Sequence, residues 1–381
     1  MKILIGADIM PTDTNLELFV AGDGETLVGK ELLALLQGAD YRIFNLEVPL
    51  TDVAAPIEKN GPNLIAPTAS VAGYKALGVD LLTLANNHIM DQGEQGFLST
   101  LESLEKSGIE FVGADRNAML AALPGTFPLD DKTIGVYACA EHEFSIAGEN
   151  APGANPFDPL ESPDHVAALK KQCDYVIVLY HGGKEHYRYP SPNLQKVCRK
   201  LVEKGADLVL CQHSHCIGCE EKYLHGTIVY GQGNFLFDHS KSEFWQTSLL
   251  VQLGDGFEIT YIPLRKQENT VRLAAGEEGE AILSQFRHRS EQIREPGFIE
   301  QAYARFAKTM TEQYLLSLSS IPTHSFLFRA VNKLTGYRWG RWLVRRAYQK
   351  KKLLSIRNCI QCEAHAELLL AGITTDGREE K

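Results

Sequence analysis

Short apolar runs alternate with segments of helical periodicity through the first 240 residues of the chain. Apolar runs are found at 2–8, 41–47, 79–85, 109–115, 133–140, 173–181, 207–212 and 227–230, and helical patterns at 25–39, 71–78, 95–108 and 193–206. Strands that alternate with helices are typical of a layered α/β domain. The pattern therefore predicts an α/β fold for this part of the chain.

The pattern changes near residue 264. Residues 247–254 and 257–264 have the apolar character of an antiparallel strand pair that closes the sheet, whereas residues 270–371 show helical periodicity with few strand signals. We therefore expect one domain over 1–264 and a helical, partly basic C-terminal region over 265–381. The proline-rich segment 54–68 is expected to form a loop or lid near the strand ends.

Composition restricts the class of protein. A hydrophobic content of 44% and a charged content of 23% are typical of a soluble globular protein, and the net charge of −10 argues against nucleic acid as a partner. The first apolar run is interrupted at Asp8, too early for a signal peptide, and no run of 18 apolar residues occurs. These features predict a cytoplasmic protein.

Polar side chains recur where the apolar strands stop. In an open α/β sheet the carboxyl ends of the strands meet in one crevice, where ligands bind. The sequence therefore predicts one site at that edge, built from Asp8, Glu47, Asn86, Asn87, His88, Asp91, His181, His213 and His215.

These side chains offer carboxylate, amide and imidazole donors. A lone Asp after a strand is more often a turn or cap residue, and a lone His is more often a hydrogen-bonded interior group. Their recurrence after successive strands instead favours one or two divalent ions, Mn, Zn or Fe, with ligands Asp8, Glu47, Asn87, His181, His213 and His215. A serine nucleophile is not indicated, because the chain has no GxSxG motif.

Five motifs in order resemble one bacterial family. They are GADIM, FNLEVPLT, the segment from LANNHIMDQG to IEFVGA, the segment from YHGGKEHYRYP to LCQHSH, and IVYGQGNFLFD, covering about residues 3–239. Together they are similar to the capsule-synthesis protein CapA family, also called the poly-gamma-glutamate biosynthesis family. That family resembles the calcineurin-like metallophosphoesterases, which implies a four-layer αββα sandwich with a two-metal site at the strand ends.

The resemblance assigns roles to individual residues. Asp8 stands where the phosphoesterase DxH motif begins, Glu47 takes the place of a metal-bridging Asp, and Asn87, His181, His213 and His215 match the remaining ligands. His88 matches the catalytic imidazole, with Asp91 as its acidic neighbour; alternatively His88 only orients Asp91. The chain departs from the pattern at Met10, which replaces a histidine ligand, and Asn45, Asp91 and Glu185 are candidates to compensate for it.

The implied activity is metal-dependent hydrolysis of a phosphoester or a gamma-glutamyl amide during assembly of a capsule polymer. The substrate would be an anionic polymer or a phosphate-containing molecule. Because fold does not determine chemistry, a non-catalytic, metal-binding accessory protein of a capsule-assembly complex stays open as the alternative.

Five further residues are candidates for substrate contact: Asn86, Lys184, Glu185, Arg188 and Asn234. Lys184 and Arg188 follow His181 closely and could bind an anion, although charged loop residues are more often solvated. Asn234 lies between small and aromatic residues in GQGNFLFD, where it either bonds to a metal ligand or belongs to a simple turn.

The C-terminal region has an uneven charge distribution. Residues 313–362 contain ten Lys and Arg and no Asp or Glu, and aromatic residues lie among them. This composition is typical of a helix at an anionic membrane surface. We therefore expect residues 324–352 to dock peripherally on the inner membrane leaflet or on a capsule-assembly partner; alternatively, they pack on the acidic domain.

Overall fold

The computed structural model describes residues 1–237, 241–319, 321 and 325–375. It divides into two compact units, Met1–Glu300 and Gln301–Lys381. Within the described residues, no helix combines the length and the apolar character needed to cross a bilayer.

The larger sheet of the first unit is mixed. Its strand order is β16-β15-β14-β1-β2-β3-β4, and β13 pairs with β1. The strands are β1 Ile3–Ile9, β2 Tyr41–Leu46, β3 Leu81–Thr83, β4 Glu110–Val112, β13 Asn234–Leu236, β14 Thr247–Leu253, β15 Ile259–Gln267 and β16 Thr270–Leu273. Strands β1 to β4 are parallel, and β14 to β16 extend the sheet in antiparallel fashion.

The second sheet has the order β11-β12-β10-β9-β7-β6. Its strands are β6 Gly125–Leu129, β7 Lys132–Ala140, β9 Tyr175–His181, β10 Leu208–Gln212, β11 Glu220–Tyr223 and β12 Gly226–Tyr230. The central strands β7, β9, β10 and β12 are parallel. Two short strands, β5 Ala114–Asp115 and β8 Gly153–Ala154, pair separately.

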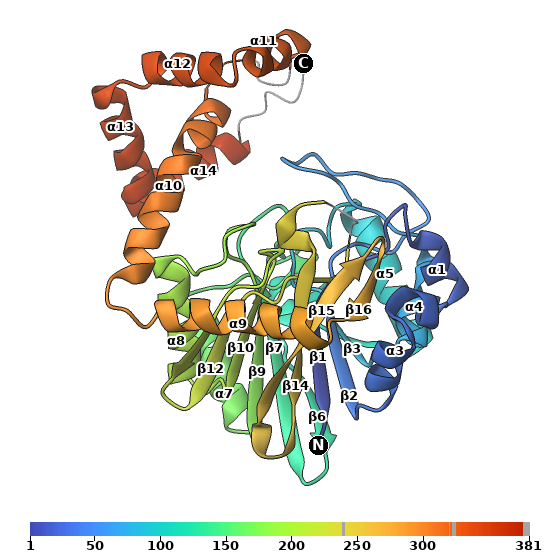
Figure 1. Cartoon of the computed structure of the whole chain (residues 1–381). Coiled ribbons are helices and arrows are strands. Elements are labelled where there is room, and N and C mark those ends of the chain that lie inside the picture. Colours follow the sequence, from blue (N-terminus) through green and yellow to red (C-terminus); the bar gives the residue numbers. More distant parts are fainter. Residues whose placement is uncertain (238–240, 320, 322–324, 376–381) are drawn as a thin grey trace. The chain divides into compact units, whose positions relative to one another are not determined.

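Helices cover the outer faces of both sheets (Figure 1). On the side of the first sheet lie α1 Leu16–Ala21, α2 Gly24–Val28, α3 Lys30–Gln37, α4 Val71–Ala76 and α5 Gly93–Ser107. On the side of the second sheet lie α7 Ser162–Lys170 and α8 Pro192–Glu203. The short α6 Ala118–Ala121 contacts β5 and β8.

The period of two along β9 shows how the layers are held together. Ile177 and Leu179 face the core shared with the first sheet, whereas Val176, Val178 and Tyr180 face a second core with α7 and α8. Both faces of the strand are buried, as expected of a parallel strand between two layers. The predicted α/β four-layer αββα sandwich is confirmed.

The first unit extends beyond the boundary expected at residue 264. That position lies inside β15, the sheet continues through β16, and α9 Gly276–Gln292 contacts both β11 and β15. The reason is that Phe286 and Ile282 of α9 belong to the main hydrophobic core, which a helical pattern alone does not reveal. The compact unit ends at Glu300 instead.

The second unit is helical, as expected for the C-terminal region. Its helices are α10 Phe298–Ser317, which begins at the end of the first unit, α11 Phe326–Leu334, α12 Arg338–Ala347, α13 Lys350–Gln361 and α14 Glu363–Thr375. Leu315, Val344 and Tyr348 form its small core.

Candidate metal centre

Parallel strand register brings the polar residues to one edge of the two sheets. Asp8 on β1 pairs with Asn45 on β2, and Glu47 follows directly after β2. His181 ends β9 beside Gln212 of β10, and His213 follows Gln212. The convergence expected from the strand ends is therefore present in the structure.

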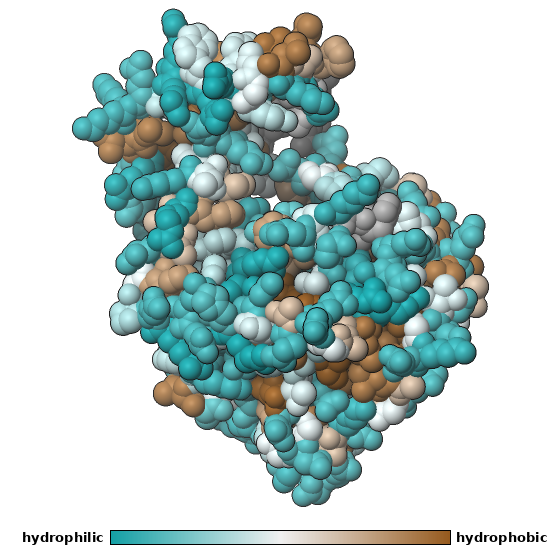
Figure 2. Space-filling model, viewed as in Figure 1, coloured by the Kyte–Doolittle hydropathy of each residue, from teal (hydrophilic) through white to brown (hydrophobic). Residues whose placement is uncertain are grey.

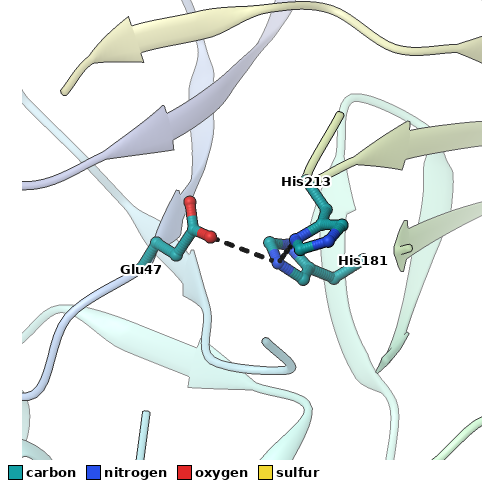
Figure 3. A group of neighbouring side chains, drawn as sticks. All are labelled: Glu47, His181 and His213. Atoms are coloured by element: carbon teal, nitrogen blue, oxygen red, sulfur yellow. Dashed lines mark hydrogen bonds and ion pairs between the residues drawn. The ribbon is translucent and has the colours of Figure 1, made fainter. Parts of the chain in front are cut away.

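The first group of donors surrounds His181 Nε2. Glu47 Oε1 lies 3.3 Å from this nitrogen, Asn87 Oδ1 lies 3.0 Å from it, and His213 Nδ1 lies 3.2 Å from it. Figure 3 shows Glu47, His181 and His213 pointing toward one another. Four ligand-type atoms from four chain segments thus meet at one point, which is the donor number of a typical zinc site.

A second group shares Glu47 with the first. Ligand atoms of Asp8, Glu47 and His215 lie within 4.8 Å of one another, as do those of Glu47, His181 and His213. His215 Nδ1 lies 3.7 Å from Asp8 Oδ2 and 2.8 Å from Asn234 Oδ1, so Asn234 holds the His215 ring in place. Glu47 is therefore placed to bridge two cations.

The electrostatics of Glu47 indicate a missing positive charge. Both carboxylate oxygens are buried, and among the residues that the structure describes neither has a hydrogen-bond partner, although His181 Nε2 is 3.3 Å from Oε1. Burial, followed by repulsion from Asp8, raises the pKa of Glu47 well above its usual value, and burial also raises the pKa of Asp8. A buried carboxylate without a partner is costly, and a bound cation would satisfy it. The residues present thus fit a divalent ion.

The three histidines have the protonation state that a metal requires. Burial lowers the pKa of His181 well below its usual value, lowers that of His213 to about 3, and lowers that of His215. All three rings are therefore neutral at neutral pH, the form in which imidazole binds metal. His213 and His215 also have left-handed backbone angles, with φ values of 83° and 53°, strain that is common at functional sites.

Met10, which stands where the phosphoesterase pattern has a histidine ligand, is buried. Its side chain is 6% exposed and packs in the main hydrophobic core. Of the residues considered to compensate for it, Asn45 directs its amide nitrogen at Asp8 Oδ1, at 2.8 Å. Glu185 is 41% exposed, with Oε1 4.0 Å from His213 Nε2. The group around Asp8 thus offers three donors, one fewer than the group around His181.

His88 and Asp91 form a dyad beside Asn87, one of the candidate metal ligands. His88 Nδ1 lies 2.6 Å from Asp91 Oδ2, which also accepts a hydrogen bond from Leu64 N at 2.7 Å. Lys59 forms an ion pair with Asp91 Oδ1, and its Nζ is 3.3 Å from His88 Nδ1. Asp91 therefore holds the ring of His88 and anchors the 54–68 loop at the same time.

Sequence analysis did not identify Lys59. Its side chain is 3% exposed, an unusual burial for lysine, and it belongs to the proline-rich loop expected to lie near the strand ends. Nothing in the local pattern distinguishes it from the solvated lysines of other loops. The one available signal was the position of that loop next to the NNH motif.

The other candidate substrate contacts differ in whether their side chains lie near the donor groups. Asn86 is fully buried, donates to Leu46 O and Asn45 Oδ1, and accepts a bond from His88 N, so its amide supports the loop rather than facing the centre. Arg188 donates to Ile217 O and lies over the Phe244 ring. Lys184 is half-buried, and its charge contributes to the low pKa of His213, which places it near the centre.

An aromatic wall adjoins His215 and was also missed. The rings of Phe237 and Trp245 lie 5.0 and 4.9 Å from the His215 ring, and Trp245 Nε1 donates to His186 Nε2 at 2.9 Å. Phe237 directly follows β13, and Trp245 ends the short 3-10 helix Glu243–Trp245 before β14; no sequence pattern linked either residue to the QHSH motif. They pack against one side of the His215 ring.

Comparisons with solved structures give distant similarities. A putative 5'-nucleotidase from Staphylococcus aureus matches with a TM-score of 0.43 at 15% identity, over 75% of this chain and 58% of that one. A phosphatase from Mycoplasma pneumoniae matches with a TM-score of 0.44 at 13% identity, over 70% of this chain and 94% of that one.

Comparisons with curated sequences are more specific. The PGA biosynthesis protein CapA of Bacillus subtilis is 29% identical over 61% of this chain and 63% of its own length, and the capsule biosynthesis protein CapA of Bacillus anthracis is 29% identical over 56% and 54%. The chain thus spans less than two thirds of these relatives. The family model described as bacterial capsule synthesis protein PGA_cap matches residues 2–239, and the chain belongs to this family.

Proposed function

We propose that the protein is a metal-dependent hydrolase that acts on a phosphoester or a gamma-glutamyl amide during capsule polymer synthesis. The observation that carries this proposal is the fully buried Glu47 carboxylate, which two groups of donors share and which has no hydrogen-bond partner among the described residues. Manganese, zinc or iron is the bound metal, because the donors are neutral imidazoles, carboxylates and one amide. When bound, it supplies Lewis acidity and an activated water.

The chain's own residues have distinct roles in this proposal. Glu47, Asn87, His181 and His213 hold the first ion, and Asp8 and His215 hold the second together with Glu47. Asp91 Oδ2 accepts a hydrogen bond from His88 Nδ1, which leaves His88 Nε2 to carry a proton to the leaving group. Leu64 N fixes the other side of the same Asp91 oxygen.

An anionic substrate is supported by the cation beside the centre. Lys184 is half-buried and lies close enough to His213 for its charge to lower the pKa of that ring. The relatives named for PGA biosynthesis support an anionic polymer as the substrate. Six buried and two half-buried cysteines, all free, support a reducing, cytoplasmic location.

A non-catalytic accessory role is the second candidate. It is favoured by the three-donor group at Asp8, since Met10 stands where the phosphoesterase pattern has a histidine ligand and belongs to the main hydrophobic core. A relative from Mycobacterium tuberculosis, 27% identical, has the name probable polyglutamine synthesis accessory protein. In this case the ion would organise the strand ends without turnover.

Metal-loaded protein assayed against phosphomonoesters, phosphodiesters and gamma-glutamyl peptides separates the two candidates. The hydrolase proposal expects turnover that is lost in His88→Ala with metal content unchanged, and lost in His213→Ala with metal content reduced. His225→Ala, at an exposed histidine, is the matched control and should change neither quantity. A stable metal site without turnover on any substrate class would select the accessory role.

A further inference from the structure

Helix α11 of the second unit exposes an apolar stripe. Leu327, Val331 and Leu334 are spaced at i, i+4 and i+7, the repeat of one helix face, and are 75, 37 and 86% exposed. Phe326, 84% exposed, lies at the edge of this face. The helix thus presents its apolar side to solvent, the reverse of the usual arrangement in a globular protein.

The opposite side of α11 is held inside the unit. Phe328 is 6% exposed, and its ring lies 5.2 Å from that of Trp339 on α12. Ser325 caps the helix by accepting a hydrogen bond from Phe328 N at 3.2 Å. The contact of Phe328 with Trp339 therefore fixes the orientation of α11. The stripe is exposed although the other side of the helix is packed.

Helix α12 adds positive charge and a further aromatic side chain. Arg338, Arg341, Arg345 and Arg346 are all exposed, with Trp342 between them at 53% exposure. Arg346 lies over the Trp342 ring, at 5.5 Å from its centroid. Only Arg345 has a carboxylate partner among these four, Glu312 at 3.1 Å, within the described residues.

The apolar stripe and the basic side chains lie on connected elements. Helices α11 and α12 follow one another along one edge of the unit (Figure 1), and a hydrophobic patch covers α11 (Figure 2). Lys350, Lys351 and Lys352 are exposed at the start of α13. Apolar and aromatic side chains next to clustered Arg and Lys, with no acidic residue from 313 to 362, match the chemistry of an anionic lipid surface.

We propose that residues 326–352 dock the protein peripherally on an anionic lipid bilayer. Leu327, Val331, Leu334 and Phe326 enter the boundary between headgroups and acyl chains, while the arginines of α12 and the lysines of α13 contact lipid phosphates. This docking is independent of whether the metal centre catalyses hydrolysis. A bilayer is favoured over an acidic protein partner because the exposed stripe consists of aliphatic side chains, which an anionic protein surface would leave partly in water.

The test is co-sedimentation of the full chain with vesicles of phosphatidylcholine alone and of phosphatidylcholine with 30% phosphatidylglycerol. Binding is expected to the anionic vesicles only, and to fall as salt is raised. Leu327→Ser with Leu334→Ser should lower the partition coefficient about tenfold or more. Arg341→Gln with Arg346→Gln should lower it by a similar factor.

Matched controls distinguish docking through residues 326–352 from nonspecific binding to the vesicles. Leu368→Ser with Leu369→Ser alters two exposed leucines of α14, which has no basic residue, and should leave binding unchanged. Lys30→Gln with Lys106→Gln removes two exposed charges of the first unit and should also leave it unchanged. All variants are checked for unaltered circular dichroism and metal content.

Three results would overturn the proposal. These are equal binding to neutral vesicles, no binding to anionic vesicles, or a loss of binding that is the same in the control variants. Self-association in analytical ultracentrifugation that Leu327→Ser with Leu334→Ser abolishes, in a protein that ignores vesicles, would assign the stripe to a second copy of the chain instead. None of these outcomes depends on finding a substrate.

Discussion

His181 Nε2 and His213 Nδ1 lie 3.2 Å apart although the residues are separated by 32 positions in the chain. Both rings are buried, and burial lowers both pKa values, so two neutral imidazole nitrogens face each other beside the Glu47 carboxylate. At most one of these nitrogens can donate to the other. A cation between them and Glu47 would use both lone pairs, and this relationship is the basis of the first prediction.

Protein purified without chelator is expected to contain manganese, zinc or iron. His213→Ala removes one of four donors around His181 and should lower metal content and affinity by at least about tenfold, because even outer partners of metal ligands affect affinity by that factor. Elemental analysis of the purified proteins is the measurement. A metal-free protein that stays so after reconstitution would exclude the centre.

The two donor groups should fill in separate steps. The group around His181 has four donors and the group around Asp8 has three, so one ion binds tightly and a second binds more weakly. Asp8→Asn should abolish only the weaker step in calorimetric titration with Mn²⁺. Asp115→Asn, at a half-buried aspartate outside both groups, is the control. Loss of both steps in Asp8→Asn would show that the sites are not separable.

The strand ends could be predicted from the sequence because a continuous apolar run stops abruptly at a polar residue. Asp8, Glu47, His181 and the QHSH motif each follow such a run, and parallel pairing then brings them together. Lys59, Phe237 and Trp245 could not be predicted, because they reach the centre through loop paths that local periodicity does not encode. The domain boundary expected at residue 264 differs from the end of the compact unit for a related reason. The helical pattern of α9 is the same whether the helix packs on a sheet or on other helices.

Metal should stabilise the protein more at pH 7.5 than at pH 5.5. Glu47 and Asp8 have raised pKa values in the folded state. Above about pH 4 the metal-free folded state therefore still holds protons that the unfolded chain has released. Its free energy of unfolding consequently falls as pH rises through the raised pKa values. Bound metal displaces these protons and removes that loss. The increase in Tm on adding Mn²⁺, measured at both pH values, should be the larger at pH 7.5.

The pKa values of the histidines are shifted in the opposite direction to those of Glu47 and Asp8. They nevertheless predict the same result, a larger stabilisation by metal at the higher pH. Their folded pKa values are lowered, so their contribution to stability is full above about pH 6.5 and is lost as pH falls toward the value of about 3 for His213. Acid therefore protonates the ligands as the chain opens and weakens metal binding. An equal Tm increase at both pH values, or a larger one at pH 5.5, would contradict the assignment of these ligands.

Removal of His88 should affect turnover without affecting metal. In the proposed hydrolase, His88→Ala loses a general acid, which is worth about 10²–10⁴-fold in rate. Asp91→Asn should cause a smaller loss, because the ring remains but its orientation is no longer fixed by a carboxylate. Metal content measured together with the rate distinguishes a loss of the general acid from damage to the metal centre. Equal rates in both variants and in the wild type would show that the His88 and Asp91 dyad has no role in the mechanism.

Lys59 should make a large contribution to stability for a lysine in a loop. The Lys59 and Asp91 side chains are 3% and 1% exposed, so Lys59→Met leaves a buried carboxylate without its cation. Removing one partner of a buried ion pair costs about 3–5 kcal/mol in the free energy of unfolding.

Lys106→Met is the matched control, because its pair with Glu102 is exposed and worth under about 0.5 kcal/mol. Chemical denaturation measures both values, and hydrogen exchange at Leu64 N, which donates to Asp91, shows whether the loop has detached. Similar stability in the two variants would mean that the hydrogen bonds from His88 and Leu64 are enough to hold Asp91, and that Lys59 does not fasten the loop.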